Sequence, residues 1–281
     1  MSPAARPRAG ILERVLERWQ VTPPMEPTAD ALDELHAAYL RHVPFENATK
    51  LIKAARVMSP DAAIRGPVEF WEDHLRWGSG GTCFASSYAY QFLLRFLGFR
   101  SRLLFCHLPA EKPQAHTALL VEIGDARWLV DVGYALPVPV ALPARLTTLR
   151  ATPLYDIELR RGLQDECLLF TEDARGQRFR YRFVPRAVSE GAYLAAWRES
   201  FRLEALYMRR LAFGRFRAGV RYLYKEPGRI YAISRLGEET IPLQGQEATA
   251  LAGFFKFPEV LLDTALRSAD RLGSLRLNPA G

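Results

Sequence analysis

The hydrophobic pattern changes its period once along the chain, and this change limits the possible folds more than any other feature of the sequence. Residues 11 to about 98 carry apolar side chains at helical spacing, which predicts amphipathic helices. From about residue 101 the apolar residues instead alternate in short runs between glycine-containing turns, which predicts strands. Because helices precede a run of strands and do not alternate with them, the expected fold class is α+β.

The helical part of the sequence divides into at least three predicted helices. Two lie before residue 45 and are separated by Pro23, Pro24 and Pro27, since proline interrupts a helix. A third is predicted over residues 84–97, with Gly98 where a C-terminal cap is expected. The positions at helical spacing are Ile11, Val15, Leu16 and Trp19, then Leu32, Leu35, Tyr39 and Leu40, and in the third helix a buried stripe of Ala85, Tyr88, Ala89, Phe92, Leu93 and Phe96.

The second half of the chain predicts a β-rich middle and a mixed end. So many short strands in sequence favour a small barrel or a curled sheet. After residue 189 the pattern predicts a helix over 192–213, strands near Tyr222, Ile230 and Ile241, and a last helix over 246–255. We therefore expect a helical bundle over 1–100, a central β-barrel over 101–200 and a C-terminal α/β lid over 201–281. The strands of the middle part are expected at 103–108, 115–123, 126–132, 155–160, 166–171 and 178–184.

The charge of the chain does not by itself identify a partner. A net charge of +7 would suit an anion such as the phosphates of a nucleotide-like cofactor, nucleic acid or a membrane surface. The arginines are scattered, however, and no zinc-finger spacing, RNA-binding signature or basic zipper accompanies them. No apolar stretch approaches the roughly 20 residues that span a bilayer. We expect neither nucleic acid nor a membrane as a partner.

The cysteines and the N-terminus favour a cytoplasmic location. Three widely spaced cysteines, an odd number, do not resemble a disulfide framework. The first ten residues, MSPAARPRAG, have no apolar core behind them of the kind that a signal peptide needs. A reducing compartment is therefore the expectation.

Cys83 is the candidate nucleophile. It follows the segment Gly78-Ser79-Gly80-Gly81-Thr82 and directly precedes the predicted helix over 84–97. Glycines allow a tight turn and a close approach by another group. A helix start presents unpaired N–H groups and the positive end of the helix dipole, which favour a thiolate. A cysteine before a helix also occurs simply as a packing residue, and the local pattern leaves both interpretations open.

Cys106 and Cys167 are weaker candidates. Each lies within an apolar run that is typical of a strand, where cysteine behaves as a small hydrophobic residue. A metal site of Cys106, His107 and His116 is disfavoured, because adjacent strand residues point to opposite faces. We expect core packing for both cysteines and no bound metal.

A predicted hairpin brings His116 and Asp131 together. If residues 124–125 are its central turn, Ile123 pairs with Ala126, and outward counting places His116 and Asp131 diagonally on one face. Their Cβ atoms then lie roughly 7 Å apart, which an imidazole and a carboxylate can bridge. A one-residue slip would put them on opposite faces. The alternative is a histidine at a strand end and an aspartate at an exit turn, with no joint function.

Gly133 fits this predicted pairing, and the other histidines are weaker candidates for a functional role. Gly133 would face His116 across the hairpin and leave room for its ring. His36 and His42 lie on or just beyond a predicted helix, and His74 lies beside Glu72 and Asp73. Surface or structural roles are expected for these three histidines.

Taken in order, these segments resemble the arylamine N-acetyltransferase family over nearly the whole chain. Residues 43–47, Val-Pro-Phe-Glu-Asn, resemble its "PFEN" signature, and residues 80–84, Gly-Gly-Thr-Cys-Phe, resemble its "RGGxCF" motif. Residues 94–99 resemble the helix end that follows. Residues 116–121 and 129–133 resemble the segments that carry the family's histidine and aspartate. The C-terminal part, with Gly253-Phe254-Phe255, follows the family only loosely.

The resemblance implies a bundle, a barrel and a lid, with a cysteine-protease-like Cys-His-Asp core. It assigns Cys83 as nucleophile, His116 as base and Asp131 as the group that orients the imidazole. It also implies ping-pong transfer of an acetyl or other acyl group from acetyl-CoA, or another acyl-CoA, through a cysteine thioester to an aromatic amine or hydrazine. Small-molecule donor and acceptor are the expected partners. The substrate pocket is expected to include Phe45, Phe84 and Tyr134.

Three departures from the family motifs bear on the substrate. Ser79 replaces the arginine before the double glycine, so the cation it supplies must come from elsewhere. Ala85 and Ser87 replace an acidic residue and an asparagine, and the segment "DVGFG" becomes Asp-Val-Gly-Tyr-Ala at 131–135.

These departures keep other functions open. One is an amide synthase or macrolactam-forming enzyme of a biosynthetic pathway whose donor is an acyl carrier protein. Others are a transglutaminase-like amidase and a non-catalytic binding protein on the same scaffold.

Overall fold

Helices dominate the first third of the chain. The computed structural model describes residues 6–57, 59–109 and 115–277. Its N-terminal helices surround a single short strand, β1 (Phe45–Glu46). The helices are α1 (Arg6–Trp19), α2 (Ala29–His42), α3 (Ala48–Val57), α4 (Pro60–Ala63), α5 (Pro67–Trp77) and α6 (Cys83–Phe96).

Helix α6 differs from its predicted form in which residues it buries. Its C-terminus is followed by Gly98 at φ 87°, a left-handed conformation suited to the predicted cap. The predicted stripe is wrong at Phe96, whose side chain is 40% exposed. Polar residues on other faces are buried instead, because partners satisfy them: Ser87 donates to the Thr117 carbonyl and Gln91 to the Ser101 carbonyl. The helix is therefore packed nearly all round.

The strands form three separate antiparallel sheets. The first has the order β2-β3-β4-β5, the second β6-β7-β8-β9 and the third β1-β10-β11-β12-β13. The strands of the first two sheets are β2 (Arg100–Cys106), β3 (His116–Ile123), β4 (Ala126–Val130), β5 (Val140–Ala141), β6 (Thr147–Arg150), β7 (Asp156–Arg161), β8 (Cys167–Asp173) and β9 (Gly176–Phe183). The third sheet adds β10 (Phe213–Arg217), β11 (Val220–Glu226), β12 (Arg229–Ser234) and β13 (Gly237–Pro242).

The predicted closed barrel is wrong. Among the described residues, the first two sheets are joined only by an isolated bridge between His107 and Arg182, not by a continuous ladder. The edge strand β5 has two residues, and the segment around it contains Pro137, Pro139 and Pro143. Proline has no N–H to donate, so this segment cannot extend the ladder toward β6.

The C-terminal part also departs from the prediction. The single helix expected over 192–213 is instead α7 (Glu190–Glu199) and a short α8 (Leu206–Arg209). The helix expected over 246–255 is confirmed as α9 (Glu247–Phe255), but a further helix, α10 (Glu259–Leu277), was not predicted. Helix α10 packs against α3, so the end of the described chain returns to the N-terminal helices.

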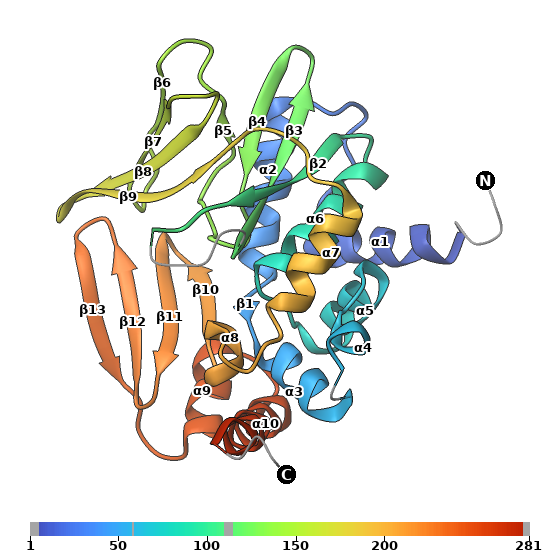
Figure 1. The fold of residues 1–281 in the computed structure, drawn as a ribbon, viewed down its shortest axis with the longest axis vertical. Helices are drawn as coiled ribbons and strands as arrows, with labels where there is room; N and C mark the ends of the chain where they lie inside the picture. Colours follow the sequence, from blue (N-terminus) through green and yellow to red (C-terminus); the bar gives the residue numbers. More distant parts are fainter. Residues whose placement is uncertain (1–5, 58, 110–114, 278–281) are drawn as a thin grey trace.

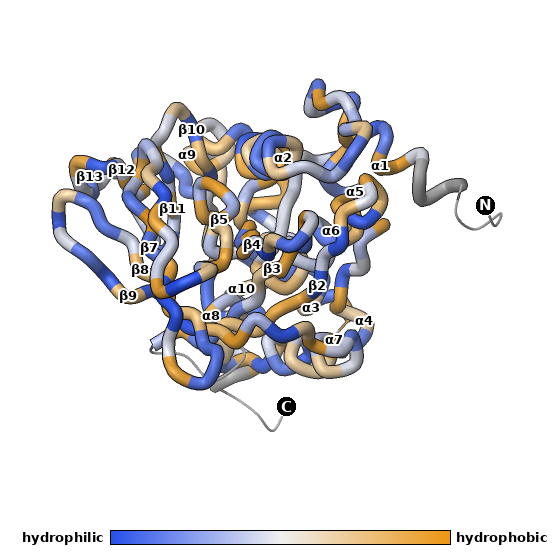
Figure 2. Tube along the Cα trace, turned by 90° about the horizontal axis from the view of Figure 1, so that it is seen from above, coloured by the Kyte–Doolittle hydropathy of each residue, from blue (hydrophilic) through white to orange (hydrophobic). Residues whose placement is uncertain are grey.

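The layers of the molecule are visible in two perpendicular views. The helices α1, α5 and α6 lie on one side and the second and third sheets on the other, with β2, β3 and β4 between them (Figures 1 and 2). One apolar core joins the helices to part of the third sheet, and a smaller one lies between the first two sheets. None of the described helices is long and apolar enough to cross a membrane.

Candidate active site

The two N-terminal motifs meet in space at the start of α6. Phe45 forms an isolated parallel bridge with Gly81, and the Glu46 N–H donates to the Gly81 carbonyl at 3.3 Å. A Cβ on Gly80 would lie 1.8 Å from the Pro44 carbonyl oxygen, so no other residue fits there. The glycines are thus required for the close approach that fixes the position of the first turn of α6.

Buried polar groups hold Glu46 and Asn47, the end of the first motif, in place. Glu46 is fully buried and accepts from the N–H and hydroxyl of Thr49, at the first turn of α3. The Asn47 side chain donates to the carbonyls of Tyr207 and Arg210 and accepts from the Ala212 N–H. Glu46 and Asn47 therefore connect the start of α3 to the segment that leads into β10.

Arg65 places a cation beside the glycine turn, where position 79 carries a serine. Its buried guanidinium donates to the Gly80 carbonyl, pairs with Asp73 at 3.0 Å and lies 4.0 Å from Glu46. The Ser79 hydroxyl is buried and has no hydrogen-bond partner in the described part of the chain. The positioning charge therefore comes from the segment between α4 and α5.

Cys83 is the first residue of α6. The helix is predicted to begin at residue 84 and begins one residue earlier. The thiol is 5% exposed, and its sulfur lies 3.8 Å from the Ala115 carbonyl oxygen, next to His116 in the chain. A Cβ on Gly133 would lie 2.5 Å from the Cys83 Cβ and 3.2 Å from the His116 Cε1. Gly133 thus leaves the space that the thiol and the imidazole share.

The hairpin holds His116 against Asp131. Ile123 pairs with Ala126, which confirms the predicted register. The His116 Nε2 lies 2.7 Å from the Asp131 Oδ2. Asp131 is fully buried, and its other oxygen accepts from the Tyr134 backbone N–H at 2.7 Å.

Tyr181 is a partner of Asp131 that the sequence did not reveal. Its hydroxyl donates to the Asp131 Oδ2 at 2.7 Å from strand β9, in the second sheet. The tyrosine ring is also 5.4 Å from the imidazole of His116, centroid to centroid. No local signal in the sequence links a tyrosine fifty residues away to this carboxylate.

The charges of this cluster are coupled. Burial disfavours a charged imidazole, but the Asp131 carboxylate and the Cys83 side chain outweigh it and raise the pKa of His116 to about 10. Burial likewise acts to raise the pKa of Asp131, yet His116, Tyr181 and the Tyr134 N–H together hold it below its ordinary value. A protonated imidazole therefore lies between a carboxylate and a sulfur.

A cavity of about 1310 Å³ opens onto this cluster. Cys83, His116 and Gly133 form part of its wall, and so do Phe45, Phe84 and Tyr134, the residues expected in the pocket. The Phe84 ring packs against Tyr193 and Trp197, and the Phe45 ring against Tyr207. The cavity is thus aromatic near the thiol. Its basic lining residues are Lys50, Arg175, Arg178, Arg180, Arg202, Arg209, Arg221 and Lys225.

Lys50 is the buried cation of this cavity. It is 9% exposed, and its ammonium donates to the backbone carbonyl and the hydroxyl of Ser200 at 2.6 and 2.9 Å. No carboxylate among the described residues pairs with it. Burial lowers the pKa of Lys50 to about 8, although Cys83 acts in the opposite direction.

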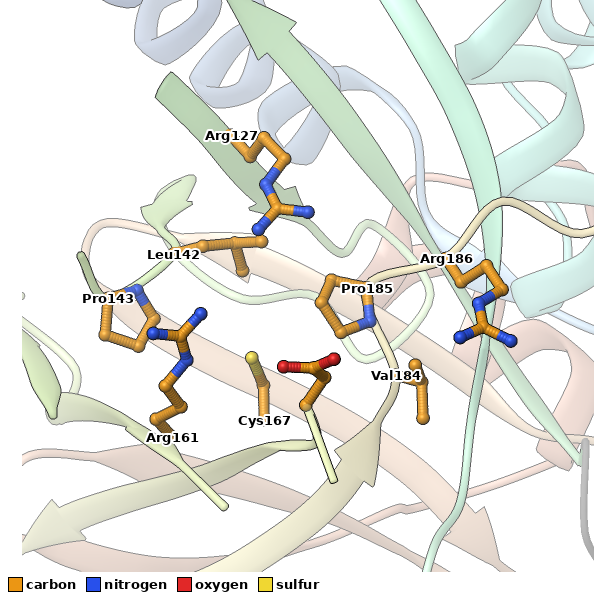
Figure 3. Close-up of a pocket in the computed structure, with 9 residues that line it drawn as sticks. Arg127, Leu142, Pro143, Arg161, Cys167, Val184, Pro185 and Arg186 are labelled. Atoms are coloured by element: carbon orange, nitrogen blue, oxygen red, sulfur yellow. The ribbon is translucent and has the colours of Figure 1, made fainter. Parts of the chain in front are cut away.

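The other cysteines lie in the core, as predicted. Cys106 and Cys167 are both buried, and burial raises the pKa of each thiol, which disfavours a thiolate. Cys167 lines a second, smaller cavity of about 230 Å³ with Arg127 and Arg161 (Figure 3). This cavity shares no lining residue with the one that contains Cys83.

His36 and His74 have structural contacts, and the half-buried ring of His42 stacks on Trp19 at 5.8 Å, centroid to centroid. His36 is fully buried and bonds the Leu136 carbonyl at 2.7 Å. His74 donates to the Ser79 carbonyl and accepts from the indole N–H of Trp19. Within the described ranges, no three histidine, cysteine or acidic residues are placed to hold a metal ion.

Comparisons with known proteins give one consistent result. A family model described as N-acetyltransferase matches residues 28–195. The arylamine N-acetyltransferase of Escherichia coli is 30% identical over 201 residues, which are 65% of this chain and 68% of that protein. The arylamine N-acetyltransferase / N-hydroxyarylamine O-acetyltransferase of Salmonella typhimurium is 30% identical over 128 residues, 43% of either chain, so that alignment spans less than half of the relative.

A solved structure matches over more of the chain. The Mycobacterium marinum arylamine N-acetyltransferase in complex with CoA superposes with a TM-score of 0.74 at 22% identity, covering 93% of this chain and 99% of that one. That likeness concerns the fold, while the family model and the E. coli relative carry the assignment. The chain belongs to the arylamine N-acetyltransferase family, a family of enzymes.

Proposed function

We propose that the protein transfers an acetyl or other acyl group from an acyl-CoA to an aromatic amine or hydrazine through a thioester on Cys83. The observation that carries the proposal is that Cys83 and His116 line one large cavity while His116 bonds the buried carboxylate of Asp131 behind it. Family membership supports the reaction class, and the CoA complex of the M. marinum protein supports the donor.

The first half-reaction uses the charges of the cluster. The imidazolium of His116 stabilises the Cys83 thiolate, which attacks the acyl carbon of the donor thioester. The N–H groups at the start of α6, before the Ser86 N–H that donates to the Thr82 carbonyl, have no acceptor within the helix and are available to the oxyanion that forms. The carbon–sulfur bond to coenzyme A then breaks, and His116 gives its proton to the departing thiolate.

The second half-reaction returns the enzyme to its starting state. The amine attacks the thioester carbon while the now neutral His116 accepts its proton. The tetrahedral intermediate collapses with Cys83 as leaving group, and an amide is released. Asp131 orients the imidazole and stabilises its protonated form, and Tyr181 and the Tyr134 N–H hold Asp131 in place.

The exposed basic residues of the cavity suit the phosphates of the donor. Arg175, Arg202, Arg209 and Lys225 are exposed side chains of its lining. Arginine binds phosphate through paired hydrogen bonds. The aromatic wall near the thiol offers an apolar surface to the ring of the acceptor.

Intact-mass measurement after incubation with acetyl-CoA tests the first half-reaction. We expect a single acetyl adduct on the wild type, its absence in Cys83→Ala, and its retention in Cys106→Ala and Cys167→Ala. An adduct that survives in Cys83→Ala would refute the assignment of the nucleophile. Addition of an aromatic amine should remove the adduct and yield the amide.

Other donors separate the alternative functions. An amide synthase would be acylated by an acyl carrier protein thioester but not by acetyl-CoA. A transglutaminase-like amidase would be acylated by a carboxamide with release of ammonia. A binding protein would be acylated by none of these three donors.

A further inference from the structure

The smaller cavity, of about 230 Å³, lies where the first two sheets fail to close into a barrel. Its walls come from β4, from the segment after β5, from the β7–β8 hairpin and from the segment after β9. Pro143 and Pro185 form part of this wall, and proline cannot donate the hydrogen bonds that would pair the two sheets there. We call this space the junction cavity.

Three arginines from three elements line the junction cavity. Arg127 projects from β4, Arg161 is the last residue of β7, and Arg186 follows β9. Arg161 pairs with Cys167 across the β7–β8 ladder, so the two side chains share one face of the sheet. Figure 3 shows the guanidinium groups of Arg127 and Arg161 turned toward the Cys167 sulfur, with Arg186 on the other side of Pro185.

None of these three guanidinium groups has a partner in the described part of the chain. Arg127, Arg161 and Arg186 form no ion pair with a described carboxylate, and their side chains donate no hydrogen bond to another described residue. The neighbouring exposed Arg160, in contrast, pairs with Glu158 at 2.6 Å. The cations of the junction cavity are therefore left available to a ligand.

The lining of the junction cavity has an excess of positive charge. Asp165 is the only acid among its described lining residues, so the three arginines leave two positive charges without a counterion. All three arginines are exposed, which keeps the cavity open to solution. Its volume is below the roughly 300 to 1,000 Å³ of pockets for drug-sized molecules. The cavity therefore suits a small anion with two charges.

We propose that Arg127, Arg161 and Arg186 form a binding site for a small phosphate monoester. The site is separate from the cavity that contains Cys83 and does not depend on the reaction proposed above. A phosphate monoester carries a charge of about −1.5 to −2 at pH 7, which matches the excess charge of the lining. Its three terminal oxygens can accept hydrogen bonds from three guanidinium groups, whereas a carboxylate has only two oxygens.

The position of the site connects it to the candidate catalytic residues. Strand β4 ends directly before Asp131, and β9 carries Tyr181, whose hydroxyl donates to the Asp131 carboxylate. A phosphate held by Arg127 and Arg186 joins β4 to the end of β9, on the two sheets that this hydrogen bond already links. Binding should therefore stabilise the junction between the first two sheets.

Calorimetric titration with methyl phosphate at constant ionic strength tests the site. We expect saturable binding to the wild type and a loss of about tenfold or more in Arg127→Gln and Arg161→Gln, because charged hydrogen bonds are removed. Arg161→Lys should retain part of the affinity, since lysine keeps the charge but not the paired donors. Arg186→Gln should have a smaller effect. Arg182→Gln is the control, because Arg182 is exposed, lies 3.9 Å from Glu166 and does not line the junction cavity.

Two singly charged analogues test the ligand class. Dimethyl phosphate and methyl sulfate should each bind at least about tenfold more weakly than methyl phosphate, because they leave one positive charge of the lining unmatched. Equal binding of all three anions would indicate attraction by the surface charge alone and would overturn the proposal. So would the absence of saturable binding of methyl phosphate to the wild type.

The thiol of Cys167 reports where the phosphate binds. Cys167 is 4% exposed and lines the junction cavity; burial raises the pKa of its thiol, and the nearby Arg127 and Arg161 act in the opposite direction. In peptide-resolved alkylation by N-ethylmaleimide, methyl phosphate should slow the reaction of Cys167 and leave that of Cys83 unchanged. Slowing at Cys83 alone would place the phosphate in the other cavity and overturn the proposal.

Coenzyme A is the other source of phosphate, and competition distinguishes it. Saturating coenzyme A should not displace methyl phosphate from the wild type, since the two cavities share no lining residue. Displacement would show that the arginines serve the acyl donor. Methyl phosphate should also raise the unfolding temperature of the wild type but not of Arg127→Gln. Without ligand the two proteins should unfold at similar temperatures, because the Arg127 guanidinium makes no ion pair or hydrogen bond with the described residues.

Discussion

The guanidinium of Arg65 donates a hydrogen bond to the carbonyl oxygen of Gly80, three residues before Cys83. Arg65 is 6% exposed and stacks on the Phe70 ring, 4.8 Å from its centre. The chain thus keeps a cation at the glycine turn although Ser79 stands where the family motif has arginine.

Arg65→Met should therefore weaken both the fold and the nucleophile. It leaves the Gly80 carbonyl and the buried Glu46 without their cation, which we expect to lower the free energy of unfolding by about 2 to 4 kcal/mol. Urea unfolding measures the loss, and the rate of Cys83 alkylation by iodoacetamide at pH 7 should fall with it.

A second substitution tests the replacement directly. In Arg65→Met/Ser79→Arg the new guanidinium starts from the position of the family arginine, and part of the alkylation rate should return. If Ser79→Arg rescues neither rate nor stability, Arg65 does not take over that role.

Local rules made Cys83, His116 and Asp131 candidates, and only the family resemblance joined them into one cluster. Cys83 lies at a helix start, and the parity of a tight hairpin places His116 and Asp131 on one face. Tyr181, Arg65 and Arg221 could not be predicted, because each reaches the site from another element through tertiary packing. The predicted barrel was wrong for a related reason. Closure of a barrel depends on whether the edge strands pair, and the alternation of apolar and polar residues along a single strand does not report this.

Gly133→Ala should damage the reaction more than the fold. The added methyl would lie 2.5 Å from the Cys83 Cβ and 3.2 Å from the His116 Cε1, so the thiol and the imidazole must move apart. We expect kcat to fall by about 100-fold, since small misplacements of reacting groups have costs of that order. Gly253→Ala is the control, because a Cβ there meets nothing within 4 Å and alanine favours a helix. Equal losses in both variants would contradict the prediction.

Asp131→Asn should change how stability depends on pH. In the folded wild-type protein the pKa of His116 is about 10, above its ordinary value of 6.5. The stability that the protonated imidazole contributes is therefore fully present below pH 6.5 and is lost as the pH rises toward 10. Asparagine removes the carboxylate that raises this pKa. The stability difference between wild type and variant should therefore narrow from pH 6.5 to pH 10 in urea unfolding. A difference that stays constant would show that the pair is not charged.

Lys50→Met should reveal the cost of a buried ammonium. Burial lowers the folded pKa of Lys50 from 10.5 to about 8, so the folded state loses this proton at lower pH than the unfolded chain does. Between these values the unfolded state binds more protons, and stability rises with pH. Measured relative to Lys50→Met, the wild type should gain roughly 3 kcal/mol from pH 8 to pH 10.5.

A control variant separates the effect of the buried ammonium from the titration of an ordinary, ion-paired lysine. Lys53→Met removes a lysine from the same helix, where the ammonium pairs with Glu69 at 2.6 Å. If the wild type gains no stability relative to Lys50→Met, the ammonium of Lys50 is solvated in solution. It then does not remain enclosed by Ser200 and by the Phe201 ring, whose centre lies 4.6 Å from the ammonium. In that case water would screen the charge of Lys50 at the cavity wall, and the ammonium would have no electrostatic effect on Cys83.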